Sequence, residues 1–273
     1  MSRVNEVFKK GKGNILNVYS TAGYPQLHST LDVMKALQEH GANIIELGMP
    51  YSDPLADGPV IQHSSSIALA NGMTIAKLFE QLIDFRNNSP SGVPEQAKGR
   101  NIVRGISIPV ILMGYMNPVL QYGFEKFCAD AAAVGIDGLI LPDLPEYEFE
   151  TEYGVIIKKH NLDFIFLVTP ETSGERIRKL DSLGSGFLYA VSSSSTTGSD
   201  KNTANTDEFL LRLKNLKLEN PVLVGFGINN KQAFDAVCKL SEGAIIGSAY
   251  IKALENSMDV NAATKSFLSS ILG

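Results

Sequence analysis

The sequence predicts an α/β fold, a closed (β/α)8 TIM barrel with an extra N-terminal helix. Short apolar segments typical of buried strands alternate along the chain with segments whose apolar residues recur at helical spacing. Strands that are apolar along nearly their whole length are typical of a parallel sheet covered by helices. Eight such strand–helix units, each of roughly 25 to 45 residues, are the number that closes a barrel. A doubly wound open sheet is the alternative.

The elements follow one another at regular intervals. We expect strands at residues 14–20, 43–48, 108–113, 138–141, 163–168, 186–191, 221–224 and 244–246. We expect helices at residues 4–10, 29–41, 60–70, 74–87, 124–134, 146–160, 176–181, 207–215 and 231–240, with more helix up to residue 272. Residues 114–118 are expected to form a loop. The polar segment 88–107 has no regular pattern, and the alternation resumes after it. We therefore interpret it as a surface insertion on an αβ connection within one domain, 1–273.

Composition excludes several classes of partner and compartment. A chain of 273 residues, 44% of them hydrophobic, can bury a sizeable core. The net charge of −5, with no basic cluster, argues against nucleic acid and anionic membranes as partners. No apolar segment approaches the ~20 residues of a membrane span, and residues 1–13 lack the apolar centre of a signal peptide. Cys128 and Cys238 have no nearby partner and are expected to be reduced thiols of a cytoplasmic protein.

The segment 44–62 carries the strongest sign of chemistry. Its strand ends in a proline-rich loop and contains the carboxylates Glu46, Asp53 and Asp57. A buried charge such as that of Glu46 is costly without a role or a partner, and apolar surroundings should raise its pKa and suit it to donate a proton. Asp57, on a polar loop, should stay ionised. We therefore expect Glu46 and Asp57 to be catalytic. The alternatives are a structural Glu46, bonded to a backbone amide or to a buried tyrosine such as Tyr115 or Tyr189, and an Asp53 that only shapes the loop.

Other unusual residues also follow predicted strands, where barrels of this kind have their active sites. They are Tyr19, Tyr115, Asn117, Asp143, Thr169, Tyr189 and the segment 192–197. After the last two strands, glycine-containing turns open helices, and such turns can bind an anion through backbone amides. We therefore predict a phosphate site formed by Gly198, Gly225, Gly227, Gly247 and Ser248; the alternative is that these glycines only terminate strands. No two histidines have the spacing of metal ligands, so no metal site is expected.

These motifs resemble those of a known family. Residues 46–48 and 52–62 closely match the signature of the tryptophan synthase α subunit, and the similarity continues at residues 114–118, 138–145, 196–198, 225–228 and 247–249. It covers essentially the whole chain, and a TIM barrel is also this family's fold. The resemblance implies a carbon–carbon lyase of tryptophan biosynthesis. Such an enzyme cleaves indole-3-glycerol phosphate by a retro-aldol step to indole and glyceraldehyde 3-phosphate.

The resemblance also implies roles for single residues. Glu46 matches the glutamate that protonates the indole ring carbon and takes the proton of the glycerol hydroxyl, and Asp57 matches the aspartate that stabilises the positive indole nitrogen. Thr197 matches a threonine on a loop that closes over Asp57. The expected substrate-binding residues are Tyr19, Tyr115, Tyr189, Thr197, Gly198, Gly225, Gly227, Gly247 and Ser248.

The family assembles as an α2β2 tetramer, so the resemblance implies a β subunit as partner. The loops with Asp53 and Pro54 and with Asn117 and Pro118 would dock that subunit and pass indole to it. Pyridoxal phosphate is expected in the β subunit, and no cofactor in this chain.

The sequence departs from the family pattern at three places. Ser195 stands where relatives usually have glycine, Tyr19 replaces a common phenylalanine, and the 88–107 connection is longer than usual.

Two other functions are alternatives. One is that of another phosphate-binding barrel, such as an indoleglycerol-phosphate synthase or a phosphoribosyl isomerase, which would favour a catalytic lysine or an aspartate pair at strand ends. The other is a non-catalytic partner of a β subunit, against which intact Glu46, Asp57 and Thr197 argue.

Overall fold

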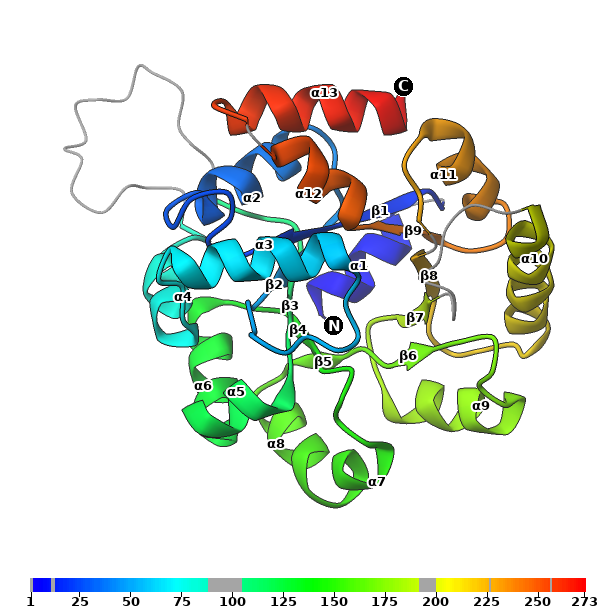
Figure 1. The fold of residues 1–273 in the computed structure, drawn as a ribbon. Coiled ribbons are helices and arrows are strands. Elements are labelled where there is room, and N and C mark those ends of the chain that lie inside the picture. Colours follow the sequence, from blue (N-terminus) through cyan, green and yellow to red (C-terminus); the bar gives the residue numbers. More distant parts are fainter. Residues whose placement is uncertain (1, 11–12, 88–104, 192–199, 226, 256) are drawn as a thin grey trace.

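The computed structural model consists of a ring of parallel strands surrounded by helices (Figure 1). It describes residues 2–10, 13–87, 105–191, 200–225, 227–255 and 257–273. The strands are β1 (Ile15–Thr21), β2 (Ile44–Gly48), β3 (Val110–Met113), β4 (Gly138–Ile140), β5 (Asp163–Phe164), β6 (Leu167–Val168), β7 (Leu188–Val191), β8 (Val222–Gly225) and β9 (Gly243–Ile246). They are hydrogen-bonded in the order β5-β4-β3-β2-β1-β9-β8-β7-β6.

The ring closes through one interrupted strand. β5 and β6 are the two halves of the segment predicted as a single strand at 163–168. Between them, the backbone N–H of Ile165 donates to Leu139 on one side (3.0 Å), and the carbonyl of Phe166 accepts from Tyr189 on the other (3.0 Å). Neighbouring strands therefore bond all the way round, which confirms the predicted eight-stranded barrel and excludes the open sheet.

Helices cover the outside of this ring in Figure 1. They are α1 (Arg3–Lys10), α2 (Thr30–Glu39), α3 (Pro59–Ala70), α4 (Ile75–Leu82), α5 (Met116–Tyr122), α6 (Phe124–Val134), α7 (Glu146–Glu148), the π-helical η2 (Phe149–Tyr153), α8 (Gly154–Lys159), α9 (Gly174–Leu183), α10 (Asp200–Asn215), α11 (Lys231–Cys238), α12 (Ser248–Leu254) and α13 (Val260–Leu272). Some of them begin at a capping side chain: Ser173 and Asn230 accept hydrogen bonds from the first turns of α9 and α11.

Several boundaries differ from the prediction. α4 ends five residues before residue 87, because Asp84 adopts a left-handed conformation (φ 61°) that ends a helix. α10 begins at Asp200 rather than at residue 207. The loop predicted at 114–118 is wrong in its second half, because Asn117 and Pro118 lie in the first turn of α5, where proline is tolerated.

The barrel interior is apolar at its N-terminal end. Side chains at alternate strand positions form an inner cluster of Ile15, Ile44, Ile111, Ile140, Ile165, Phe187, Leu223 and Ile245. Val4 and Phe8 of α1 pack against this cluster, and Arg3 forms an ion pair with the buried Asp137 (2.7 Å). The extra N-terminal helix therefore closes this end of the barrel, where Asp163, the first residue of β5, is also buried.

The two ends of the connection predicted as an insertion, 88–107, lie close together on the barrel. The backbone N–H of Ile106 donates to the carbonyl of Phe85 (2.9 Å), so the two ends of the segment lie side by side. Residues 88–104 are outside the described part of the chain, and their place as a surface insertion stays a prediction.

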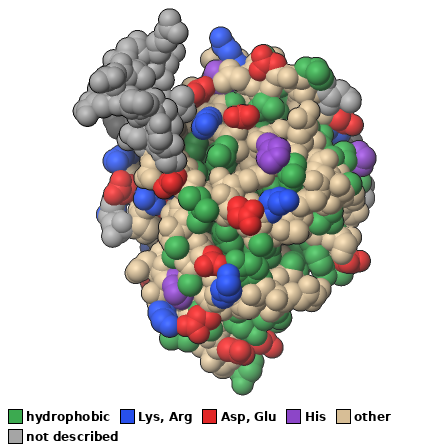
Figure 2. All heavy atoms as spheres, turned by 90° about the vertical axis from the view of Figure 1, so that its left-hand side faces the viewer, with side chains coloured by type: hydrophobic (Ala, Val, Ile, Leu, Met, Phe, Trp, Pro, Cys, Tyr) green, Lys and Arg blue, Asp and Glu red, His purple; other side chains and the backbone are tan. Residues whose placement is uncertain are grey.

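Charges of both signs are spread over one face of the molecule (Figure 2). On the face shown in Figure 2, acidic and basic side chains alternate with apolar ones, and the described residues there form no large patch of one sign. Among the described helices, none is both long and apolar enough to cross a membrane.

Candidate active site

Glu46 lies inside the barrel near the carboxyl end of β2. Its residue is only 1% exposed, and in the sheet it pairs with Tyr19 of β1 and Ile111 of β3. Its carboxylate Oε2 accepts a hydrogen bond from Nδ2 of Asn17 (2.9 Å). Among the described residues, Asn17 is the side-chain hydrogen-bond partner of Glu46, and neither Tyr115 nor Tyr189 bonds it.

Glu46 and Asp57 lie in different environments, which give their carboxyl groups different pKa values. Burial raises the pKa of Glu46 to about 8; the Asn17 hydrogen bond opposes this shift, and the charge of Asp57 adds to it. Burial raises the pKa of Asp57 to about 6, and a hydrogen bond from Tyr115 opposes it. At pH 7 Glu46 is thus mainly protonated while Asp57 is mainly ionised, in agreement with the expected division between an acid and an anion.

Tyr115 connects the loop of Asp57 to the next strand. Its hydroxyl accepts a hydrogen bond from the backbone N–H of Ala56 (3.1 Å) and donates one to Asp57. Tyr115 precedes α5, whose first N–H, that of Met116, donates to both carboxylate oxygens of Asp143 (3.0 Å each). Asp143 therefore has a structural role here: it caps the helix that follows Tyr115.

Two further tyrosines lie across glycines of neighbouring strands. A Cβ atom on Gly48 would lie 2.1 Å from the Tyr19 hydroxyl, and one on Gly225 would lie 2.6 Å from the Tyr189 ring. Both rings therefore need a residue without a side chain beside them. The hydroxyl that Tyr19 adds finds a partner in Thr21, whose Oγ1 lies 3.4 Å away. The charges of Glu46 and Asp57 both act on the two phenols, which places all four groups in one site.

The turns predicted to bind phosphate lie next to each other. β8 and β9 pair with Leu223 opposite Gly243, so Gly227 and Gly247, each four residues further along, follow the two strands at the same level. Gly227 has a left-handed conformation (φ 60°), and the place of a Cβ on it is open within 4 Å. Gly247 precedes α12, and Ser248 is that helix's first residue. A Cβ on Gly247, by contrast, would lie 3.4 Å from Tyr19 and 3.5 Å from Ile61.

Thr197, Gly198 and Ser195 lie outside the described residues. The residues expected at a partner interface are on the mouth of the barrel. Among them, Asn117 donates from Nδ2 to the Tyr51 hydroxyl (3.0 Å), and Pro54 precedes Leu55, which is 93% exposed. Asp53 accepts from the Ser52 hydroxyl, so it at least shapes its loop.

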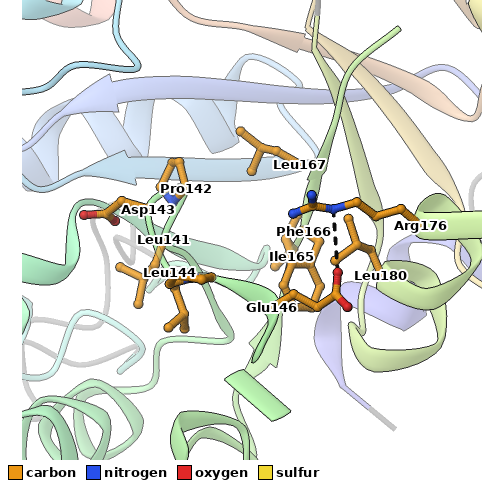
Figure 3. Close-up of a pocket in the computed structure, with 11 residues that line it drawn as sticks. Leu141, Pro142, Asp143, Leu144, Glu146, Ile165, Phe166, Leu167, Arg176 and Leu180 are labelled. Carbon is orange, nitrogen blue, oxygen red and sulfur yellow. Dashed lines mark ion pairs between the residues drawn. The ribbon is translucent and has the colours of Figure 1, made fainter. Parts of the chain in front are cut away.

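A cavity of about 210 Å³ lies between the loop after β4 and α9 (Figure 3). Its walls include Asp143, Phe166 and Leu180, and Arg176 points toward Glu146 across it (3.6 Å). Neither Glu46 nor Asp57 lines it, so this cavity is separate from the carboxyl pair.

The site residues predicted from the sequence do not include Asn17. A polar residue within an apolar strand was the available signal, because alternation along β1 places Asn17 on the same face as Tyr19, toward the barrel interior. They also omit Tyr51, whose ring packs on Tyr115 (centroids 5.4 Å apart). No feature of a single loop tyrosine distinguishes it in the sequence.

Comparisons with known proteins point to one family. The family model of the tryptophan synthase alpha chain matches residues 6–95 and 96–270. The tryptophan synthase alpha chain of Flavobacterium johnsoniae is 48% identical, and the match covers 94% of this chain and 95% of the relative. The tryptophan synthase alpha chain of Parabacteroides distasonis is 46% identical, and the match covers 94% of this chain and 93% of the relative. The crystal structure of the alpha subunit from Legionella pneumophila is 33% identical and covers 99% of this chain and 97% of its own, with a TM-score of 0.83.

These matches extend over nearly the whole length of both partners in each comparison, at identities well above those that show a fold alone. They confirm the family, the barrel and the lyase activity that the resemblance implied. The chain therefore belongs to the tryptophan synthase alpha chain family, whose members are lyases of tryptophan biosynthesis.

Proposed function

We propose that Glu46 and Asp57 carry out the acid–base steps of the family's reaction, the retro-aldol cleavage of indole-3-glycerol phosphate. Glu46 gives its proton to the ring carbon that bears the glycerol chain, and the indole nitrogen becomes positive. Ionised Asp57 stabilises that charge. Glu46 then takes the proton of the adjacent glycerol hydroxyl, the carbon–carbon bond breaks, and its electron pair returns to the ring. Indole and glyceraldehyde 3-phosphate leave, and Glu46 ends protonated as it began.

One arrangement carries this proposal: two carboxyl groups share one site, and burial raises the pKa of Glu46 to about 8 but that of Asp57 only to about 6. A proton donor and an anion are needed at the same moment, and between these two values both are present. Two carboxyl groups in similar environments would titrate at similar pH, so one could not be the proton donor while the other was the stabilising anion.

The remaining residues would bind the two ends of the substrate. The rings of Tyr19, Tyr115 and Tyr189 line the interior next to the carboxyl groups and suit a flat indole. We propose that Gly225, Gly227, Gly247 and Ser248 bind the phosphate through backbone amides and a hydroxyl. Thr197 and Gly198 are assigned by their match to the family motif alone.

We further propose that the chain works as a single domain, 1–273, in an α2β2 assembly in the cytoplasm. The interface would include Asp53, Pro54, Asn117 and Pro118, and the β subunit would hold the pyridoxal phosphate and receive the indole. The exposed Leu55 beside Pro54 supports this docking surface, because such a side chain is suited to an apolar contact. The free thiols of Cys128 and Cys238 support a reducing compartment.

The test is cleavage of indole-3-glycerol phosphate by the purified chain, alone and with a tryptophan synthase β subunit. Glu46→Gln and Asp57→Asn should each lose most of the turnover. The matched control is Glu242→Gln, because Glu242 accepts a backbone hydrogen bond from Val222 at the other end of the barrel (2.8 Å). Near-normal turnover in the Glu46 or the Asp57 variant would remove that residue from the mechanism.

A further inference from the structure

Asn17 is a buried polar residue of the barrel interior that the family reaction leaves unexplained. Its side chain is fully buried on β1, and its Nδ2 donates to Glu46 Oε2 at 2.9 Å. Among the described residues, this is the one side-chain hydrogen bond that Glu46 makes. Asn17 therefore contacts the acid directly, from the side away from the barrel mouth.

The amide of Asn17 is oriented at a cost. Its Oδ1 is buried and has no hydrogen-bond partner among the described residues. An unpaired buried acceptor destabilises a fold, and an apolar side chain of the same size would fill the space without that loss. The orientation gives an N–H to Glu46 in exchange, and such a hydrogen bond is stronger to the carboxylate than to the carbonyl oxygen of the neutral acid.

We propose that Asn17 is a positioning residue that stabilises the ionised form of Glu46 during the catalytic cycle. This inference rests on the proposed role of Glu46. Once Glu46 has protonated the ring carbon, it stays ionised until it takes the hydroxyl proton. Burial without a donor would disfavour this ionised form, and Asn17 supplies the donor and fixes which oxygen it holds.

Few other groups could produce the same effect. The charged or titratable groups that act on Glu46 are Asp57 on the loop after β2, Tyr19 on β1 and Tyr189 on β7. The pKa values of both tyrosines are raised far above their usual range by burial, so these phenols stay neutral across the working pH range. Asp57 is ionised above about pH 6. Between pH 7 and pH 10, a change in the titration of Glu46 therefore reports its local hydrogen bonding.

The experiment follows the carboxyl group itself. Infrared spectra of the full chain are recorded from pH 5 to pH 11, and the C=O band that Glu46→Gln removes is assigned to Glu46. Asn17→Leu replaces the amide by an apolar side chain of similar size, and Asn17→Val provides a smaller residue suited to a strand. The matched control is Ser20→Ala, because Ser20 is also buried on β1 and lacks a described partner for its hydroxyl, but it faces the helices.

We expect the midpoint of the Glu46 band to rise by about 1 pH unit in the Asn17 variants, the size of one hydrogen bond to a charged group. With indole-3-glycerol phosphate, kcat should fall about tenfold with little change in KM. Ser20→Ala should change neither. An unchanged midpoint in a folded Asn17 variant, or an equal rise in Ser20→Ala, would overturn the inference. Full turnover in Glu46→Gln would instead contradict the proposed function, and the infrared midpoints would still test the contact with Asn17.

Discussion

The hydroxyl of Tyr115 lies 3.1 Å from the backbone nitrogen of Ala56 and accepts its hydrogen bond. The same hydroxyl donates to Asp57, the next residue in the chain. Tyr115 follows β3 and the other two residues follow β2, so one phenol connects the loop after β2 to the end of the neighbouring strand. Because the hydrogen bond lowers the pKa of Asp57 against the effect of burial, Tyr115 controls both the position and the charge of that aspartate.

Tyr115→Phe should therefore weaken the reaction without unfolding the barrel. The loop loses two hydrogen bonds, and the pKa of Asp57 should rise above about 6, so the acid limb of the pH profile should move upward. We expect kcat to fall about tenfold, as for the loss of one hydrogen bond to a charged group. The profile is measured with indole-3-glycerol phosphate between pH 5 and pH 9.

Tyr122→Phe is the matched control for this change. Tyr122 lies on α5, and its hydroxyl donates to Asp130 away from the site. This variant should keep the wild-type profile. An acid limb at the same pH in Tyr115→Phe and in the wild type would show that Tyr115 does not set the charge of Asp57.

Glu46→Gln should make the protein more stable at alkaline pH. Glu46 has a pKa of about 8 in the folded protein, above the value of 4.5 for an unburied carboxyl group. Between these values the folded state holds a proton that the unfolded state has lost, so the stability of the wild type falls as the pH rises through this window. A glutamine has no such dependence. The gain of Glu46→Gln should grow from pH 5 to pH 8 and reach about 2 kcal/mol or more, a few degrees in Tm.

Urea unfolding at a series of pH values measures this difference. Glu242→Gln is the control and should show no comparable gain, because Glu242 is an exposed side chain. A difference between Glu46→Gln and the wild type that does not change with pH would mean that Glu46 is ionised in the folded protein at neutral pH.

Gly227→Ala should weaken the binding of phosphate and spare that of indole. The methyl group would project into the open space beside the turn after β8, where the anion is proposed to lie. We expect inorganic phosphate to bind about tenfold more weakly, which corresponds to about 1.4 kcal/mol. Calorimetric titrations with phosphate and with indole compare the two effects.

Gly72→Ala controls for backbone strain in that experiment. Gly72 also has a positive φ (89°) and open space around its Cβ position, but it lies in the turn after α3. Equal losses of phosphate affinity in the two variants, or equal losses of phosphate and indole in Gly227→Ala, would contradict the phosphate assignment.

Particular elements show which parts of the barrel the sequence could predict. Helix α6 and strand β2 stand within a residue of their expected bounds, because Gly135 and Gly48 punctuate strong apolar patterns. The break between β5 and β6 was not predictable, since it depends on which neighbour Ile165 and Phe166 bond when the ring closes. The early start of α10 has no local signal, as residues 200–206 lack apolar periodicity.

The candidate site was also predictable only in part from the sequence. Glu46 and Asp57 are recognisable because a charge in an apolar strand and an aspartate in a proline-rich loop are unusual locally. The hydrogen bonds that set their titrations come from Asn17 and Tyr115 on the two neighbouring strands. Those contacts depend on the sheet register, which pairs Tyr19 with Glu46, and a linear pattern does not show it.

The most direct test of the central claim is the pH dependence of kcat/KM for indole-3-glycerol phosphate cleavage. The phosphate group of the substrate itself titrates near pH 6, so the alkaline limb is the diagnostic one. If protonated Glu46 starts the reaction, kcat/KM should fall tenfold per pH unit above about pH 8, the pKa of Glu46. A rate that stays constant up to pH 10 in an intact barrel would show that the protonated carboxyl group of Glu46 is not the acid.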